Sequence, residues 1–152
     1  MQALNLPPFP FKIQEDSGIR KIFDPLRRKY LVLTPEEWVR QHFVQYLISV
    51  KGFPKGLFRL ESTVFHHQRK GRFDLLCMDN CNQPVLLVEC KAPGIQITQE
   101  TFDQIGRYNS KLRVPYLAVT NGLEHYFMQV DFQKSKANFI EDLPHFQYLV
   151  AP

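Results

Sequence analysis

The sequence contains no apolar run approaching the 18 or more residues of a membrane-spanning helix. Residues 1–11 lack the charged start and apolar centre of a signal peptide. There are only 3 cysteines, and no second Cys or His pair accompanies Cys77 and Cys81 to complete a zinc site. These absences exclude a membrane span and a structural zinc, and we expect a cytoplasmic protein with reduced thiols in which Cys77 lies in the core and Cys81 in a turn.

What is present is typical of a soluble globular domain. The 152 residues are 44% hydrophobic and 22% charged, with a formal charge of +4 and a pI near 9.0. A single domain of this length buries about two-thirds of its unfolded surface. The basic excess favours an anionic partner, although many basic proteins bind nothing acidic. Composition therefore leaves enzymes and binding modules equally open.

Two apolar segments, residues 73–78 and 85–88, flank a segment of turn-forming residues at 79–84. This pattern predicts an antiparallel hairpin. In a symmetric hairpin, Asp79 lies opposite Pro84. Both strands are apolar on both faces, as in a strand that is covered on both sides.

The register of this hairpin brings four charged residues onto one face: Asp74 lies opposite Glu89, and Arg72 opposite Lys91. Two opposed carboxylates about 5 Å apart cost several kcal/mol unless something compensates their charge. A divalent cation would do so, since Mg²⁺ takes carboxylate, carbonyl and water oxygens. Lys91 could then orient or deprotonate a water held by the ion. The pattern predicts a hydrolytic metal site; the alternative is a structural ion network in which Arg72 and Lys91 each pair with one acid.

Five sequence segments resemble those of one known family: LTPEEWVRQHF, YLISVKGFP, VECKAP, TFDQIGRYN and VPYLAVTNGLEHY. They lie within residues 33–131, which resemble the N-terminal nuclease domain of type I restriction enzyme R (HsdR) proteins, in the PD-(D/E)XK nuclease superfamily. GRFDLL followed by VLLVECKAP is similar to the Asp…Glu-x-Lys core of that superfamily, with Phe73 in place of the proline. The resemblance implies a restriction-endonuclease-like α/β core with a central mixed sheet flanked by helices, in the order α-β-β-β-α-β.

The resemblance also implies roles for the charged residues of the hairpin. Asp74 and Glu89 would be metal ligands, and the backbone carbonyl of Cys90 would be a third. The ion would be Mg²⁺, with Mn²⁺ as the other possibility. Lys91 would be the catalytic lysine.

The helix before the hairpin carries another candidate. Thr34 as N-cap and Pro35 at the first position predict a helix that ends near Gly52. The resemblance assigns an active-site acid to this helix, and Glu37 is the candidate. The alternative is structural, because Glu37 is placed to close a capping box with Thr34.

A second helix is predicted from Thr98 to about Asn109. Gln104 and Tyr108 share one stripe of this helix. The resemblance matches them to the catalytic Q-x-x-x-Y element of the RecB-like branch, whereas the pattern alone fits a polar helix edge equally well. Gly106 in mid-helix suggests close packing on the strands.

Basic residues near the hairpin are candidates for contacts with DNA phosphates. They are Arg69, Lys70 and Arg72 before the first strand, and Arg107 on the second helix. A solvated basic turn is the alternative interpretation of the first three. His66 and His67 point to opposite faces of an extended segment and are not expected to bind a metal together.

The remaining segments extend this core. Residues 1–32 form an N-terminal arm, in which 11–32 could fold as a hairpin over the core, and residues 132–152 form a C-terminal extension that packs on it. Further strands are expected at 57–66, 114–120 and 125–130.

The leading hypothesis is a Mg²⁺-dependent nuclease that hydrolyses DNA phosphodiester bonds. The alternative is a catalytically silent nuclease fold that binds DNA or a partner subunit, and hydrolysis of another phosphate ester is a third class. The chain has no G-x-x-x-x-G-K-[ST] loop, so we expect a separate restriction or translocase subunit to supply any motor.

Overall fold

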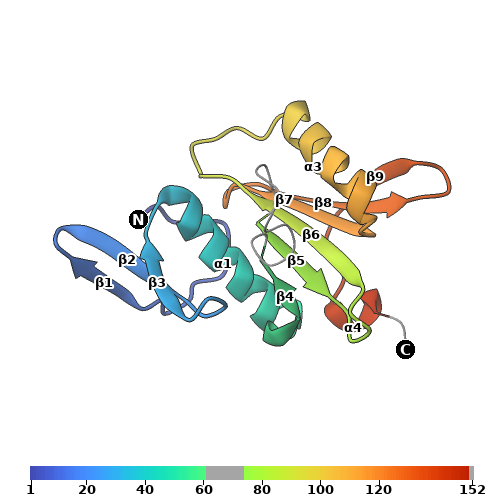
Figure 1. The fold of residues 1–152 in the computed structure, drawn as a ribbon. Coiled ribbons are helices and arrows are strands. Elements are labelled where there is room, and N and C mark those ends of the chain that lie inside the picture. The colour runs from blue at the N-terminus through green and yellow to red at the C-terminus, as the bar shows by residue number, and fades with distance from the viewer. Residues whose placement is uncertain (61–73, 151–152) are drawn as a thin grey trace.

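The protein has a mixed α/β fold built on a six-stranded sheet (Figure 1). The computed structural model describes residues 1–60 and 74–150. The strands follow one another across the sheet in chain order, as β4 (Phe58–Arg59), β5 (Leu75–Met78), β6 (Pro84–Cys90), β7 (Tyr116–Thr120), β8 (His125–Asp131) and β9 (Lys136–Ile140). β6 and β7 are parallel, and every other neighbouring pair is antiparallel.

A helix covers each face of this sheet. Leu75 faces α1 (Pro35–Ser49), whereas Leu76 and Leu87 face α3 (Gln99–Leu112). Because both faces are covered, β5 and β6 are apolar at nearly every position, as the sequence predicted. The order of helix, three strands, helix and three strands confirms the predicted α/β core, with β9 added to the two strands expected after the second helix. Within the described ranges, no helix has both the length and the apolar character needed to cross a bilayer.

The hairpin of β5 and β6 has the predicted register over most of its length. Leu75 pairs with Val88 and Cys77 with Leu86, but Met78 then pairs with Pro84 across a bulge. The predicted pairing of Asp79 with Pro84 is therefore wrong by one residue. The cause lies in the turn, where the Asp79 side chain accepts hydrogen bonds from the N–H groups of Cys81 and Gln83 and its own N–H donates to the Gln83 carbonyl. Pro84, which has no N–H, cannot complete the ladder there.

The N-terminal residues form a separate antiparallel sheet beside α1, and not the single hairpin that was expected (Figure 1). Its strands are β1 (Ile13–Asp16), β2 (Ile19–Asp24) and β3 (Lys29–Val32). Most of their residues are exposed, and Ile22 and Asp24 are the buried ones.

The C-terminal residues add an edge strand and a short helix. β9 pairs with β8, and α4 (Phe146–Leu149) returns the chain to the core. The Phe146 N–H donates to the Lys51 carbonyl at 2.7 Å, and the Phe146 ring lies 5.3 Å from that of Phe53. Of the strands expected elsewhere, 114–120 and 125–130 are confirmed as β7 and β8. Within the described residues, the strand expected at 57–66 is formed by Phe58–Arg59, and 61–66 lie outside the description.

α3 exposes Gly106, contrary to the expected close packing on the strands. A Cβ atom added at Gly106 would meet nothing within 4 Å, because the neighbouring Ile105 is the residue that turns toward the sheet. We therefore expect Gly106→Ala to raise the free energy of unfolding by about 1 kcal/mol, measured by urea denaturation.

Gly122→Ala is the matched control for that substitution. Gly122 has φ +86°, and an added Cβ would lie 2.8 Å from a methyl carbon of Leu4. The control should therefore lose stability. A loss of stability in Gly106→Ala as well would contradict the placement of Gly106 toward solvent.

Candidate functional site

The candidate site lies where the carboxyl ends of β6 and β7 meet the first turns of α1. Parallel strands end at the same sheet edge, and the Lys91 N–H after β6 donates to the carbonyl of Thr120 at the end of β7. Asp74 immediately precedes β5, which is antiparallel to β6, and so lies at this edge too. In open α/β sheets, ligands bind outside the carboxyl ends of the parallel strands.

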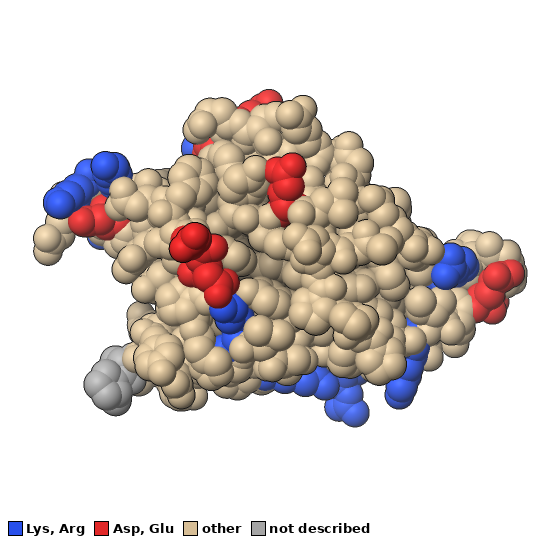
Figure 2. Space-filling model, turned by 180° about the vertical axis from the view of Figure 1, so that it is seen from behind, with Lys and Arg blue, Asp and Glu red and all other residues tan. Residues whose placement is uncertain are grey.

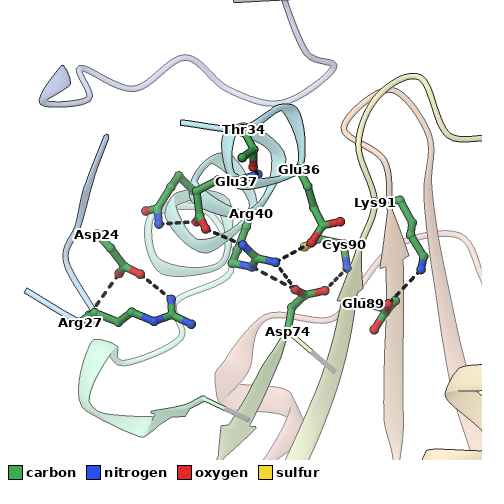
Figure 3. A network of polar contacts seen from close by, with 11 residues as sticks. Asp24, Arg27, Thr34, Glu36, Glu37, Arg40, Asp74, Glu89, Cys90 and Lys91 are labelled. Carbon is green, nitrogen blue, oxygen red and sulfur yellow. Dashed lines mark hydrogen bonds and ion pairs between the residues drawn. The ribbon is translucent and has the colours of Figure 1, made fainter. Parts of the chain in front are cut away.

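Asp74 is fixed by backbone and side-chain hydrogen bonds. Its N–H donates to the Val88 carbonyl at 3.0 Å, and its Oδ2 accepts from the Cys90 N–H at 2.5 Å. Its Oδ1 accepts from two nitrogens of Arg40, Nε at 3.0 Å and Nη2. The Asp74 carboxylate therefore turns toward α1, as Figure 3 shows.

Arg40 joins this strand residue to two acids of its own helix. Its Nη2 contacts Glu36 at 2.8 Å and its Nη1 contacts Glu37 at 2.6 Å. Burial by itself would lower the pKa of Arg40, but the charges of Asp74 and Glu37 outweigh it and raise the pKa above its ordinary value. Sequence reasoning missed Arg40, although its i,i+3 and i,i+4 spacing from the two glutamates was a signal for ion pairs on one helix face.

Glu37 is held differently from the prediction. Its N–H donates to Thr34 Oγ1 at 3.0 Å, so Thr34 is the expected N-cap. The Glu37 carboxylate does not return to Thr34, whose N–H donates to the Val32 carbonyl instead. It accepts from Arg40 and from Gln41, the latter at 2.9 Å. The predicted capping box is thus half wrong, because a charged guanidinium is a stronger partner than a backbone amide.

Glu89, in β6, and Lys91, just after this strand, form an ion pair, with Lys91 Nζ 3.2 Å from Glu89 Oε1. Burial, followed by the negative charge of Asp74, raises the pKa of Glu89 to about 8, although Lys91 acts in the opposite direction. The three residues therefore lie within electrostatic reach of one another. Half of the alternative ion network is present: Lys91 pairs with Glu89, but the cation on Asp74 is Arg40. Arg72 lies outside the described residues.

The donor atoms at this edge suit a hard divalent cation. A carboxylate has about four lone-pair sites, so Asp74 and Glu89 keep acceptor capacity beyond the bonds described above. Burial and then the charge of Asp74 raise the pKa of Glu89, and Lys91 offsets them only in part. In the part of the chain that the structure describes, no group of three or more His, Cys, Asp or Glu side chains could hold an ion. Two carboxylates, the Cys90 carbonyl and water would have to suffice.

The other sequence candidates lie around this edge or outside the description. Gln104 and Tyr108 are half-buried on α3, and Arg107 is exposed there. No hydrogen bond among the described residues joins Gln104 to Asp74, Glu89 or Lys91. Arg69 and Lys70, like Arg72, lie outside the described residues, as do His66, His67 and Phe73. Cys77 is buried and Cys81 is exposed in the turn, as predicted, and Cys90 is buried.

Charge is unevenly distributed over the surface. Seen from behind, the molecule carries acidic side chains near the middle of the face, Lys and Arg along its lower edge, and both signs of charge at its two ends (Figure 2). The described part of this face has no continuous basic surface, so the net charge of +4 does not by itself outline a nucleic-acid interface.

A family of known proteins matches most of the chain. A family described as the type I restriction enzyme R protein N terminus matches residues 35–144. No curated protein matches the chain significantly. The matched range includes α1, the whole six-stranded sheet and α3, and with them Glu37, Arg40, Asp74, Glu89 and Lys91. The chain belongs to the family of type I restriction enzyme R protein N-terminal regions, which places it in the context of restriction systems.

Proposed function

We propose that this domain is a metal-dependent DNA nuclease of the PD-(D/E)XK superfamily, RecB-like branch, that hydrolyses phosphodiester bonds at Asp74, Glu89 and Lys91. The observation that carries the proposal is the juxtaposition of two carboxylates and an ammonium group at the carboxyl edge of the sheet, where the pKa of Glu89 is raised to about 8. Such a shifted acid beside a specific charged partner is characteristic of functional sites.

Asp74, Glu89 and the Cys90 carbonyl would hold Mg²⁺ or Mn²⁺. When bound, the ion supplies Lewis-acid polarisation of the phosphate and lowers the pKa of a water. The charge of Lys91, adjoining Glu89, would neutralise negative charge that builds up on the phosphate.

The other residues of the site would orient the side chains of Asp74 and Lys91 and the DNA backbone. Arg40 holds the Asp74 carboxylate in one orientation, and Glu37 holds Arg40 in turn. Gln104 and Tyr108, on the helix that covers the Leu87 face, would steady Lys91 and the DNA backbone. Restriction R proteins imply DNA as substrate, and we propose a separate restriction or translocase subunit as partner.

The test is cleavage of supercoiled plasmid in the presence of Mg²⁺ or Mn²⁺. We expect the parent protein to nick or linearise the plasmid. Asp74→Asn and Lys91→Ala should each reduce the rate on the order of 100-fold, because each removes a charge that stabilises the transition state. Lys136→Ala, at an exposed position of β9, is the control and should cut like the parent. Cleavage that persists in both site variants would refute this assignment of the site.

A catalytically silent DNA-binding module is the second candidate. It is favoured by the engagement of Asp74 with Arg40 and by the absence of a three-ligand cluster in the described residues. In that case the parent, Asp74→Asn and Lys91→Ala would retain DNA equally and none would nick it.

A further inference from the structure

A cationic pocket lies between the N-terminal sheet and the edge of the six-stranded sheet. It has a volume of about 630 Å³. The β2–β3 turn contributes Arg28, the 3-10 helix η1 (Lys55–Leu57) contributes Lys55, and β4 contributes Arg59. No carboxylate is among its lining residues. By contrast, a pocket of about 480 Å³ beside β8 and β9 has an acid and no Lys or Arg in its lining.

Among the described residues, no carboxylate neutralises the positive charge of this pocket. In the described part of the chain, none of its three cations forms an ion pair. One acid near these residues in sequence, Asp24, is buried, and its carboxylate pairs with Arg27 at 2.6 Å. Another, Glu61, lies outside the described residues. The Asp24 carboxylate also accepts hydrogen bonds from the N–H groups of Leu26 and Arg27, so it is bound within its own turn.

One of the three cations has a fixed charged group, and a second lies on a hydrogen-bonded turn. Arg59 Nη1 donates to the carbonyls of Gly56 and Phe58 at 2.8 and 3.0 Å, which fixes the guanidinium. Its other N–H groups have no hydrogen-bond acceptor among the described residues. Arg28 sits at the end of the turn with φ +57°, and its N–H donates to the Asp24 carbonyl. Pro25, Leu26 and Phe58 supply apolar walls, and a partly desolvated anion is held more strongly than one in open water.

The sheet register places this pocket close to the acids of the proposed nuclease site. Arg59 pairs with Leu76, two residues along the strand from Asp74. Strand geometry puts the Cα atoms of Arg59 and Asp74 about 8 Å apart. One DNA strand carries a phosphate about every 3.4 Å of helix axis. A strand with one phosphate at Asp74 and Glu89 would therefore bring a phosphate two or three nucleotides away toward the pocket.

We propose that this pocket, formed by Arg28, Lys55 and Arg59, binds a backbone phosphate of the DNA strand that enters the nuclease site. The inference rests on the proposed function for its choice of DNA as ligand. Because the contact is to the backbone, it contributes affinity without sequence preference and depends steeply on salt.

The test is the binding of labelled duplex DNA of about 20 base pairs, followed by fluorescence anisotropy between about 50 and 200 mM NaCl. EDTA is present, so that no cleavage occurs and binding is measured apart from catalysis. The variant is Arg28→Gln with Lys55→Gln, both at exposed positions. The control is Lys134→Gln with Lys136→Gln, which removes the same charge from exposed positions at the β8–β9 turn and β9.

We expect the pocket variant to bind about tenfold more weakly than the parent at low salt, and its salt slope to be shallower by about 0.9, since the pocket is proposed to bind one phosphate and each lost phosphate contact contributes about 0.9. The control pair should change both much less. Equal effects of the two pairs, or no binding by the parent at low salt, would overturn the inference. If the pocket variant loses binding as expected while the parent fails to nick plasmid in Mg²⁺, the pocket stands and the nuclease proposal fails.

Discussion

Replacing Arg40 with Met is expected to lower the free energy of unfolding by about 3 kcal/mol, because the acids left behind lose a shared, largely buried partner. The side chains of Arg40, Glu37 and Asp74 are only 14%, 10% and 12% exposed. Met preserves much of the aliphatic packing, so the loss reports the charge. Urea denaturation at neutral pH measures it.

An exposed ion pair is the control for this effect. Lys21 pairs with Asp16, which is 59% exposed, and Lys21→Met should cost less than about 1 kcal/mol. Adding Asp74→Asn to the Arg40→Met protein should restore about 1 kcal/mol or more, because one uncompensated charge is removed. A cost for Arg40→Met no larger than that for Lys21→Met would show that the network does not stabilise the fold.

The parts of the fold that depend on local chemistry could be predicted from the sequence. α1 begins at Thr34-Pro35 because a hydroxyl cap and a fixed proline φ act within one turn. The β5–β6 hairpin follows from two apolar segments around a turn, and its register is correct from Leu75 to Cys77. These signals are contained in a few neighbouring residues, so no distant contact is needed to read them.

The N-terminal sheet had a local signal that the prediction missed. Asp16 pairs with Ile19 around Ser17 and Gly18, whose φ values are 52° and 79°. Two positive φ values in a two-residue turn are those of a type I′ hairpin, for which a Gly at the second position is typical. The third strand, Lys29–Val32, then follows a second turn. Two turns in this segment give three strands where one hairpin was expected.

The candidate site could be predicted only in part from the sequence, because its central contact joins residues far apart in the chain. The sequence predicted Asp74 opposite Glu89 on one face of the sheet, but the Asp74 carboxylate turns toward α1 and pairs with Arg40. Arg40 lies 34 residues from Asp74 and reaches it only after α1 has packed on the sheet. The predicted close packing of Gly106 on the strands was wrong for a related reason. A glycine in a helix shows that a side chain is absent, but the phase of the buried face decides whether that gap points to the strands or to water.

Glu89 is expected to make the protein less stable as the pH rises from about 4.5 to about 8. Its pKa in the folded protein is about 8 against an ordinary value of 4.5, so between these values the unfolded chain releases a proton that the folded protein retains. The unfolded state then binds fewer protons, and the free energy of unfolding falls by up to about 1.4 kcal/mol per pH unit in this window. Above the folded pKa the contribution becomes constant.

Glu89→Gln isolates this contribution from the other titrating groups. A neutral amide of nearly the same shape cannot ionise, so the free energy of unfolding of the variant should rise relative to that of the parent as the pH increases through this window. At the upper end of the window the variant should be more stable by about 2–4 kcal/mol. Lys91, whose side chain is 26% exposed, can be hydrated after losing its partner. The measurement is urea denaturation of both proteins at several pH values in EDTA. A difference that stays constant across the window would contradict the raised pKa.

The parent and Glu89→Gln also test whether the unfavourable burial of the Glu89 carboxylate serves the binding of a cation. A divalent cation binds the ionised carboxylate and releases its proton, so added Mg²⁺ or Mn²⁺ should raise the melting temperature of the parent more at about pH 8 than at about pH 6. Glu89→Gln should lose most of this gain, because the amide offers no negative charge. Equal gains in both proteins would mean that the cation acts elsewhere, and the two acids would then be a structural pair whose repulsion Arg40 and Lys91 only moderate.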